Sequence, residues 1–265
     1  MKHRDRVIKA LDHEETDRPP FQATFVPEFA DRLRKEFGLH PLKTDPHHRE
    51  WYGYDLEILT GQDALQAGAG WFTNYYLKDE PFTDEWGVQW SVKEYDTPFG
   101  KGSYTDIIRN PLKDDDQAAL RYKAPDPDRE ELYLHLERLI REYKDEYYII
   151  GRVHCTIFET AWALRGFESM MTDMYMNPEI ADHLFDETYN YHLRVSKNMV
   201  RLGADMIWLG DDMGSQSSLL IDPDLWRQYF QPRMSELIRQ LKAINPRIKI
   251  AYHSDGCNYE IIPDL

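Results

Sequence analysis

Apolar and polar positions follow a regular pattern from residue 125 onward. Short, mostly apolar runs at 147–153, 204–210 and 248–253 predict buried strands. Between these runs, apolar residues recur every three or four positions, which is typical of amphipathic helices. The helices predicted in this way cover residues 128–144, 158–176, 178–202 and 222–241. Strands that alternate with helices at this spacing indicate βαβ units and a parallel sheet.

The chain before residue 125 is less regular. Residues 4–13 and 28–37 have helical spacing, and residues 21–26 predict a first strand after a pair of prolines. Residues 40–127 hold many aromatic and turn residues with short alternating runs, so we expect β-hairpins and loops that lie over one end of the domain, near the barrel mouth. This segment is either an ordinary surface excursion or a lid over a substrate, and the sequence leaves both open.

These elements predict an α/β protein, with residues 1–265 as a single (β/α)8 barrel domain of TIM type. No Gly-x-Gly-x-x-Gly or Walker-type loop follows any strand, so no motif supports a nucleotide-binding doubly wound fold. About five barrel strands are recognisable, whereas a closed barrel has eight. Either strands lie hidden in residues 40–127 or the chain lacks its C-terminal βα units, and we expect the second. An unclosed barrel leaves exposed strand edges that need covering. A homo-oligomer could cover them, so it remains an expected possibility.

Composition narrows the class of partner. A net charge of −15 offers no basic stripe to nucleic acid and disfavours an anionic membrane surface. The chain has no apolar run of about 18 residues and starts with a charged amphipathic segment, so we expect a soluble cytoplasmic protein. The two cysteines, Cys155 and Cys257, make no disulfide framework. An aromatic content of 13% suggests a wide, aromatic-lined pocket or interface, and we expect a small-molecule substrate.

Each of the three regular strands ends in ionisable residues. The strand ends are Val153-His154-Cys155, Gly210-Asp211-Asp212 and Tyr252-His253-Ser254-Asp255. The carboxyl ends of parallel strands converge on one face of a barrel, about 4.8 Å apart between neighbours. Because side chains alternate along a strand, His253 and Asp255 share one side, which suits two ligands of one metal or an acid/base pair. Glu159, one helical turn beyond Cys155, is placed to reach the same mouth, whereas His154 and Cys155 are expected in the core.

Each candidate also has a purely structural explanation. A neighbouring Asp can hold a strand-end His253 in place without any metal. Cys257 can be a buried thiol that packs behind the turn. Asp211 and Asp212 can cap the turn that follows them, although their position at a strand end favours catalysis or substrate binding.

Several segments, in order along the chain, resemble the uroporphyrinogen decarboxylase superfamily. They are RVIKAL (6–11), HEETDRPP (13–20), FETAW (158–162), LRGFE (164–168), GDDMGSQ (210–216) and HSDG (253–256). The superfamily also includes corrinoid-dependent methyltransferases that act on methanol, methylamines and aryl methyl ethers. The resemblance runs through nearly the whole chain. It implies a (β/α)8 barrel with further βα units after the strand that ends at His253.

Within the superfamily, the resemblance is closer to the methyltransferase branch. True decarboxylases carry an early Arg-Gln-Ala-Gly-Arg-Tyr segment whose arginines bind the porphyrinogen carboxylates, whereas residues 21–27 are FQATFVP here. The methyltransferase branch holds zinc with a His-x-Cys strand end and a later Cys. In this chain His253 matches the His, Asp255 stands where the first Cys would be, and Cys257 lies two positions further on. Zinc accepts carboxylate oxygen, so the implied metal ligands are these three residues.

The resemblance therefore implies a methyltransferase that moves a methyl group to or from a corrinoid presented by a separate protein. Zinc at His253 and Asp255 would act as a Lewis acid. Asp211, Asp212 and Glu159 would position the substrate or complete the metal shell. A uroporphyrinogen decarboxylase-type lyase is the alternative, and a non-catalytic binding subunit is a third possibility.

Overall fold

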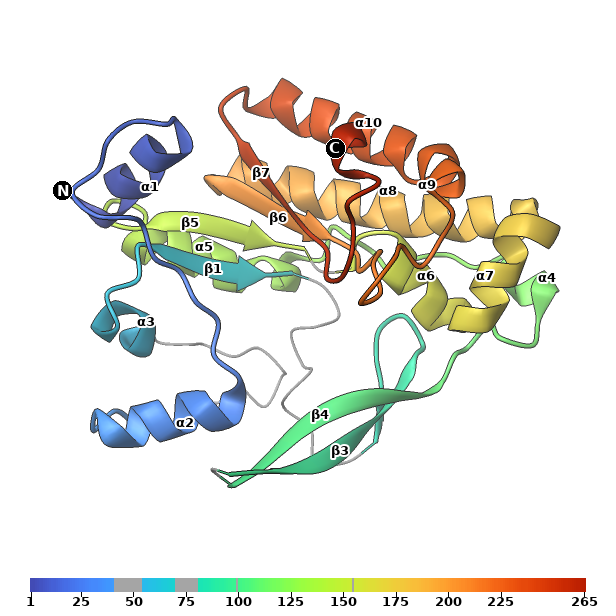
Figure 1. Cartoon of the computed structure of the whole chain (residues 1–265), viewed down its shortest axis with the longest axis horizontal. Helices are drawn as coiled ribbons and strands as arrows, with labels where there is room; N and C mark the ends of the chain where they lie inside the picture. Colours follow the sequence, from blue (N-terminus) through green and yellow to red (C-terminus); the bar gives the residue numbers. More distant parts are fainter. Residues whose placement is uncertain (41–53, 70–80, 99, 154) are drawn as a thin grey trace.

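A parallel sheet lies at the centre of the molecule (Figure 1). The computed structural model describes residues 1–40, 54–69, 81–98, 100–153 and 155–265. Within these residues the sheet has the strand order β1-β5-β6-β7. The strands are β1 (Ala64–Gly68), β5 (Tyr148–Arg152), β6 (Met206–Gly210) and β7 (Lys249–His253). All neighbours are parallel, so the carboxyl ends of the strands meet at one edge of the sheet.

Helices connect the strands and cover the sheet. They are α1 (His3–Leu11), α2 (Pro27–Glu36), α3 (Asp55–Leu59), α4 (Asp116–Ala119), α5 (Leu134–Tyr143), α6 (Phe158–Arg165), α7 (Phe167–Met176), α8 (Pro178–Leu202), α9 (Pro223–Tyr229) and α10 (Gln231–Ile244), with 3-10 helices η2 (Glu130–Leu132) and η3 (Ile262–Asp264). Pro232 stands at the start of α10, and the helix predicted from residue 222 is divided there into α9 and α10. Helices α5 and α8 pack on the sheet, and α10 packs on α8 (Figure 1).

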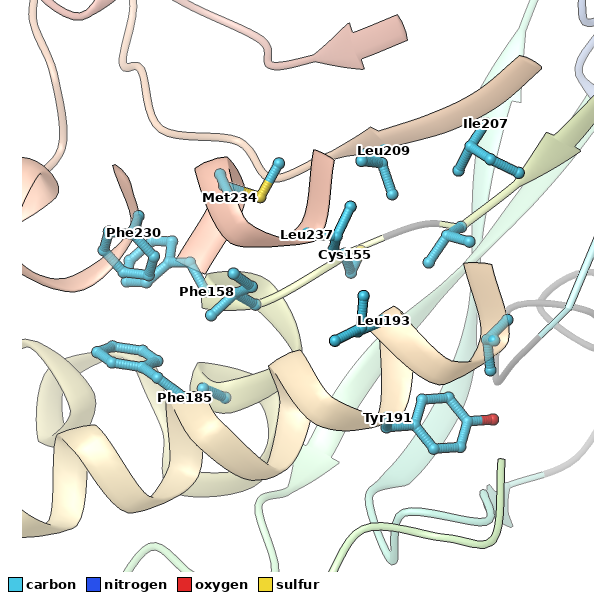
Figure 2. Close-up of a cluster of buried hydrophobic side chains, with 14 of the residues drawn as sticks. Cys155, Phe158, Phe185, Tyr191, Leu193, Ile207, Leu209, Phe230, Met234 and Leu237 are labelled. Carbon is cyan, nitrogen blue, oxygen red and sulfur yellow. The ribbon is translucent and has the colours of Figure 1, made fainter. Parts of the chain in front are cut away.

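The two faces of the sheet bury different sets of side chains. Ile149 and Ile207 belong to the main core, which the helices complete. Figure 2 shows Ile207 of β6 in this core, with Phe185 of α8 on the far side of the cluster. Ile150 and Met206, one position along each strand, point to the opposite face and pack with α1. Each such side chain, when fully buried, contributes roughly 1.5–3 kcal/mol, so both faces stabilise the sheet.

A second, antiparallel sheet lies within the segment where hairpins are predicted. It has the order β2-β3-β4, formed by β2 (Phe82–Thr83), β3 (Gln89–Thr97) and β4 (Gly100–Arg109). The ribbon of β3 and β4 extends away from the parallel sheet (Figure 1). At its base, Asp84 accepts hydrogen bonds from the backbone amides of Trp86 and Val88 and from the indole N–H of Trp90. The role of residues 40–127 as a lid stays a prediction.

The expected first strand at residues 21–26 is wrong. This segment is extended, but it is held by side chains instead of a strand ladder: the amide of Phe21 donates to Asp63, and that of Ala23 donates to Gln62. The strand at this edge of the sheet is β1, which the sequence interpretation left inside residues 40–127. The described residues thus supply four parallel strands, half the number in a closed (β/α)8 barrel.

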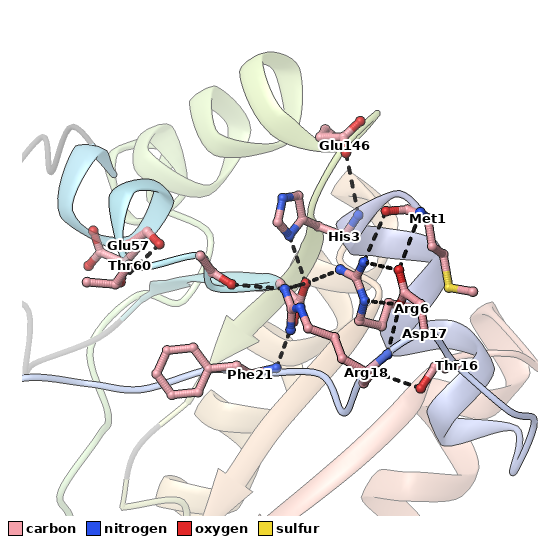
Figure 3. Close-up of polar contacts among 12 residues, drawn as sticks. Met1, His3, Arg6, Thr16, Asp17, Arg18, Phe21, Glu57, Thr60 and Glu146 are labelled. Atoms are coloured by element: carbon pink, nitrogen blue, oxygen red, sulfur yellow. Dashed lines mark hydrogen bonds and ion pairs between the residues drawn. The ribbon is translucent and has the colours of Figure 1, made fainter.

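A network of ion pairs closes the amino end of the sheet (Figure 3). Asp63, immediately before β1, has no exposed side-chain surface. Its carboxylate accepts hydrogen bonds from Arg6 at 2.6 Å, from Arg18 at 2.6 Å and from the Nδ1 atom of His3 at 2.7 Å. These partners come from the first eighteen residues, so the network ties the N-terminal segment to the start of β1.

No helix in the described part of the chain combines the length and the apolar character needed to cross a membrane.

Candidate active site at the carboxyl ends of the strands

The segments that follow β5, β6 and β7 meet at the carboxyl edge of the parallel sheet. Gly210, the last residue of β6, is in register with His253, the last residue of β7. The amide of Thr156, after β5, donates to the carbonyl of Gly210, so the segment after β5 is joined to the end of β6. The side chains named from the sequence therefore lie on adjoining segments of one edge.

Asp211 is buried and binds the start of α6. Its carboxylate accepts hydrogen bonds from the backbone amide of Ile157 at 3.0 Å and from that of Glu159 at 3.0 Å. Asp211 thus caps a helix that precedes it in the chain, and not the turn that follows it. Burial raises the pKa of Asp211, and the neighbouring charge of Glu159 raises it further, while the amide hydrogen bonds oppose this.

Glu159 shares this buried position at the first turn of α6. Its Oε2 atom accepts a hydrogen bond from the amide of Asp212 at 3.1 Å. Burial and the charge of Asp212 raise the pKa of Glu159 to about 7. Because both carboxylate oxygens of Asp211 already accept amide hydrogens, we place the shared proton of this pair on Glu159. Glu159 can therefore hold or release a proton near neutral pH.

Three ligand atoms gather on the outer side of this pair. They belong to Asp212, His253 and Asp255 and lie within 4.8 Å of one another. The Nε2 atom of His253 is 3.9 Å from Oδ1 of Asp212 and 3.7 Å from Oδ1 of Asp255. Tetrahedral zinc with bonds of about 2.0–2.2 Å places its ligand atoms about 3.4 Å apart. The nitrogen and oxygen donors are of the kind that zinc accepts. The two measured separations exceed this spacing by a few tenths of an ångström, so a small movement of the exposed side chains would form a zinc site with three protein ligands and one open position.

Cys257 does not belong to this group of ligand atoms. It is half-buried, and its amide donates to the carbonyl of Ser215 at 2.7 Å. Asp212, which the sequence interpretation assigned to catalysis or to the metal shell, lies with the other two ligand candidates instead. His154 lies outside the described residues. The assignment of Cys257 as a ligand stays a prediction.

Cys155 lies behind the carboxylates. It is buried with a backbone φ of 53°, a left-handed conformation that is uncommon outside glycine. Burial raises the pKa of its thiol, and the charge of Glu159 adds to this effect. Such strained backbone positions concentrate near functional sites. Because its pKa is raised, the thiol is protonated. A buried, protonated thiol is suited to packing behind the site and is a poor nucleophile.

The sequence interpretation missed other residues beside the site. Trp208 lies two residues before the end of β6, on the same side of the strand as Gly210, and its ring centroid is 6.0 Å from that of His253. The hydroxyl of Ser254 accepts a hydrogen bond from the amide of Met213, and the side-chain amide of Asn258 donates to the carbonyls of Ser254 and Asp255. Alternation along β6 would have pointed to Trp208, but the contacts of Asn258 depend on the loop conformation, which has no sequence signature.

A parallel α/β sheet that collects carboxylates and a histidine at the carboxyl ends of its strands has the arrangement of barrel enzymes, which place their active sites at this face. Residues 96–265 match the family model described as uroporphyrinogen decarboxylase (URO-D), and the chain belongs to this family. The family has the TIM-barrel fold, as predicted from the order of strands and helices.

A solved structure of a methyltransferase from Methanosarcina mazei is similar to this chain. The TM-score is 0.67 at 16% sequence identity, over 100% of this chain and 73% of the methyltransferase chain. At this identity the likeness shows the shared fold. No curated protein sequence matches the chain.

Proposed function

We propose that the chain is a zinc-assisted methyltransferase that transfers a methyl group to or from a corrinoid. The observation that carries this proposal is the group of Asp212, His253 and Asp255 at the carboxyl edge of the sheet. Its donor set and separations suit zinc, and a bound zinc ion would act there as a Lewis acid on the heteroatom that gives or receives the methyl group.

The residues around this group would have separate tasks. Asp212, His253 and Asp255 would hold the metal, and the remaining coordination position would be open to the substrate. Glu159, with its pKa raised to about 7, would take up or give back a proton as the heteroatom changes its charge. Asp211 would keep Glu159 in place, because it fixes the start of α6 through the amide of Glu159 itself.

The charge of the site supports methyl transfer over porphyrinogen decarboxylation. Asp212 and Asp255 lie close to His253, with Glu159 and Asp211 behind them, and none of these four carboxyl groups forms an ion pair with a lysine or arginine among the residues that the structure describes. A substrate with several carboxylates would be repelled here unless cations were supplied. The fold shared with a methyltransferase supports the same choice, although it does not identify the methyl donor.

A separate protein would present the corrinoid. Corrinoids are large, and we infer that the ring is brought to the carboxyl edge of the sheet from outside the chain, where His253 and Asp255 are largely exposed. The exposed position of these side chains supports access for such a partner, and the small-molecule substrate would reach the same edge.

Elemental analysis of the purified protein tests the metal site. We expect near-stoichiometric zinc in the wild type and a large loss in His253→Ala, because the only nitrogen ligand is removed. His13→Ala is a matched control, since His13 lies on the exposed turn after α1, at the amino end of the sheet. Equal zinc in the wild type and in His253→Ala would contradict the site.

A second assay tests the reaction. The protein is incubated with methylcob(III)alamin and a thiol, and loss of the cobalt–carbon bond is followed by absorbance. The methyl group passes to the thiolate sulfur, and both electrons of the cobalt–carbon bond stay on cobalt as cob(I)alamin. We expect the wild type to accelerate this transfer and His253→Ala to lose most of the effect. Decarboxylation of uroporphyrinogen by the wild type would favour the alternative function that the family description supports.

A further inference from the structure

The loops that follow β6 and β7 are fastened to each other. The amide of Met213 donates to Oγ of Ser254 at 2.9 Å, and the amide of Asp255 donates to Oδ1 of Asp212 at 2.8 Å. The amide of Cys257 donates to the carbonyl of Ser215 at 2.7 Å. Three hydrogen bonds thus cross between two short loops. These loops carry all three candidate zinc ligands, or begin immediately after them.

The two backbones also touch. Gly256 has a φ of 81°, and a Cβ atom at this position would lie 2.3 Å from the carbonyl oxygen of Gly214. A Cβ atom on Gly214 would lie 2.5 Å from the amide nitrogen of Cys257. Only two glycines permit this approach without displacement of one loop. Backbone contact therefore sets how closely the two loops can approach each other.

Asn258 fixes the conformation of the second loop. The two hydrogens of its side-chain NH2 group are shared among the carbonyls of Ser254 at 3.1 Å, Asp255 at 3.0 Å and Gly256 at 3.2 Å. Its Oδ1 atom accepts a hydrogen bond from Oγ of Ser254 at 3.1 Å. One side chain therefore holds three successive carbonyls. Through Ser254, it also connects to the loop that follows β6.

The ligand side chains need this support because packing does not provide it. The side chain of Asp255 is 77% exposed and that of His253 is 48% exposed. Exposed side chains keep their rotamer freedom, so their relative positions depend on the backbone that carries them. Groups outside the ligand shell typically change metal affinity 10–100-fold when they orient the ligands.

We propose that Asn258, together with Ser254, is a positioning residue that sets the separation of Asp255 and His253 from Asp212 for metal binding. This inference rests on the proposed zinc site. Asn258 does not touch the metal or the substrate. It acts through the backbone carbonyls on both sides of Asp255 and through the hydroxyl of Ser254.

Zinc affinity of the metal-free protein, measured by competition with a chromogenic chelator, tests this proposal. We expect Asn258→Ala and Ser254→Ala to weaken zinc binding about 10–100-fold. Asn258→Asp keeps the size and the acceptor but loses the NH2 donors, so it should be as weak as Asn258→Ala. Ser254→Thr keeps the hydroxyl and should retain the wild-type affinity. The visible absorption of bound Co²⁺ should also change shape in Asn258→Ala, because the ligand geometry is altered.

Asn245→Ala is the matched control. Asn245 binds the amide of Arg247 in the turn before β7, so it also fixes a loop next to this strand, but at the opposite end. We expect this variant to keep wild-type zinc affinity. Thermal unfolding in chelator shows whether each variant folds. If Asn258→Ala does not fold, the comparison of Ser254→Ala with Ser254→Thr decides.

The possible failures are distinguishable. If His253→Ala loses zinc while Asn258→Ala and Ser254→Ala bind it as tightly as Asn245→Ala, the positioning role is overturned and the zinc site stands. If the wild type binds zinc no more tightly than His253→Ala, the site itself is overturned, and the positioning role with it.

Discussion

At the amino end of β1, Asp63 is fully buried, yet two arginines, a histidine and a backbone amide surround it, and together they outweigh its burial and lower its pKa. At the carboxyl ends of β5 and β6, Glu159 is half-buried, but the charge that acts most on it is that of Asp212, and its pKa is raised to about 7. Burial alone raises the pKa of both groups. The partners decide the net direction.

This difference in charged partners distinguishes a structural carboxylate from carboxylates that are suited to bind a cation. Asp63 satisfies its charge within the chain, which joins the N-terminal segment to the sheet. Asp212 and Asp255 have only His253 as an ionic partner among the described residues, at separations that leave room for a metal between them. Such a concentration of like charges destabilises the free protein, and a bound cation would relieve it.

The largest expected effect is on stability at the amino end. Asp63→Asn removes one of the two carboxylates that compensate the buried Arg6, the other being Asp17, and also the main partner of Arg18. Breaking a buried ion pair on one side typically costs about 3–5 kcal/mol, and we expect a loss of this size in the free energy of unfolding, measured with urea. Asp255→Asn is the control at the other end, where the exposed side chain should change stability by less than about 0.5 kcal/mol. Equal losses of stability from both substitutions would contradict this difference between the two ends of the sheet.

The pH dependence of stability should have opposite signs at the two ends. Because the folded pKa of Glu159 is raised, the unfolded state ionises first, and stability falls as pH rises from about 4.5 through about 7. This loss is about 3 kcal/mol and should be absent in Glu159→Gln. Because the pKa of Asp63 is lowered, its contribution is complete above its unfolded value and is lost as pH falls through the folded one.

Urea unfolding of metal-free protein between pH 4 and pH 8 checks this prediction. The difference between the wild type and Glu159→Gln should appear between pH 5 and pH 7. A wild-type profile parallel to that of Glu159→Gln over this interval would show that Glu159 ionises as it does in the unfolded chain.

The smallest expected effect concerns Cys257. Since its thiol lies outside the group formed by Asp212, His253 and Asp255, Cys257→Ser should keep wild-type zinc content. Zinc should likewise leave the rate at which iodoacetamide alkylates Cys257 unchanged, whereas buried Cys155 should react far more slowly in either case. Protection of Cys257 by zinc would restore it to the ligand set.

The strands after residue 125 were predictable because each lies in a mostly apolar run between turn residues. β1 was not, because Ala-Leu-Gln-Ala-Gly has neither β-branched nor aromatic residues, while the segment 21–26 has both and is no strand. Hydrogen bonds from the amides of this segment to the side chains of Gln62 and Asp63 hold it instead, and such long-range contacts leave no periodicity in the sequence.

The sequence predicted where the site lies, but not what each residue in it does. Strand ends indicated Asp211, Asp212 and His253, and parallel topology brought them to one edge. The role of each carboxylate depends on which backbone amides donate to it. Asp211 faces the start of α6 while its neighbour Asp212 faces His253, and adjacent identical residues give no sign of this.

The helix cap by Asp211 also limits what this edge of the sheet can recognise. Many barrel enzymes use the positive end of a helix dipole to hold a phosphate group of the substrate. Here the amides at the start of α6 already donate to a carboxylate of the chain itself. The anion-binding capacity of that helix end is used internally. A phosphorylated ligand would therefore find no free amides to bind it at the start of α6.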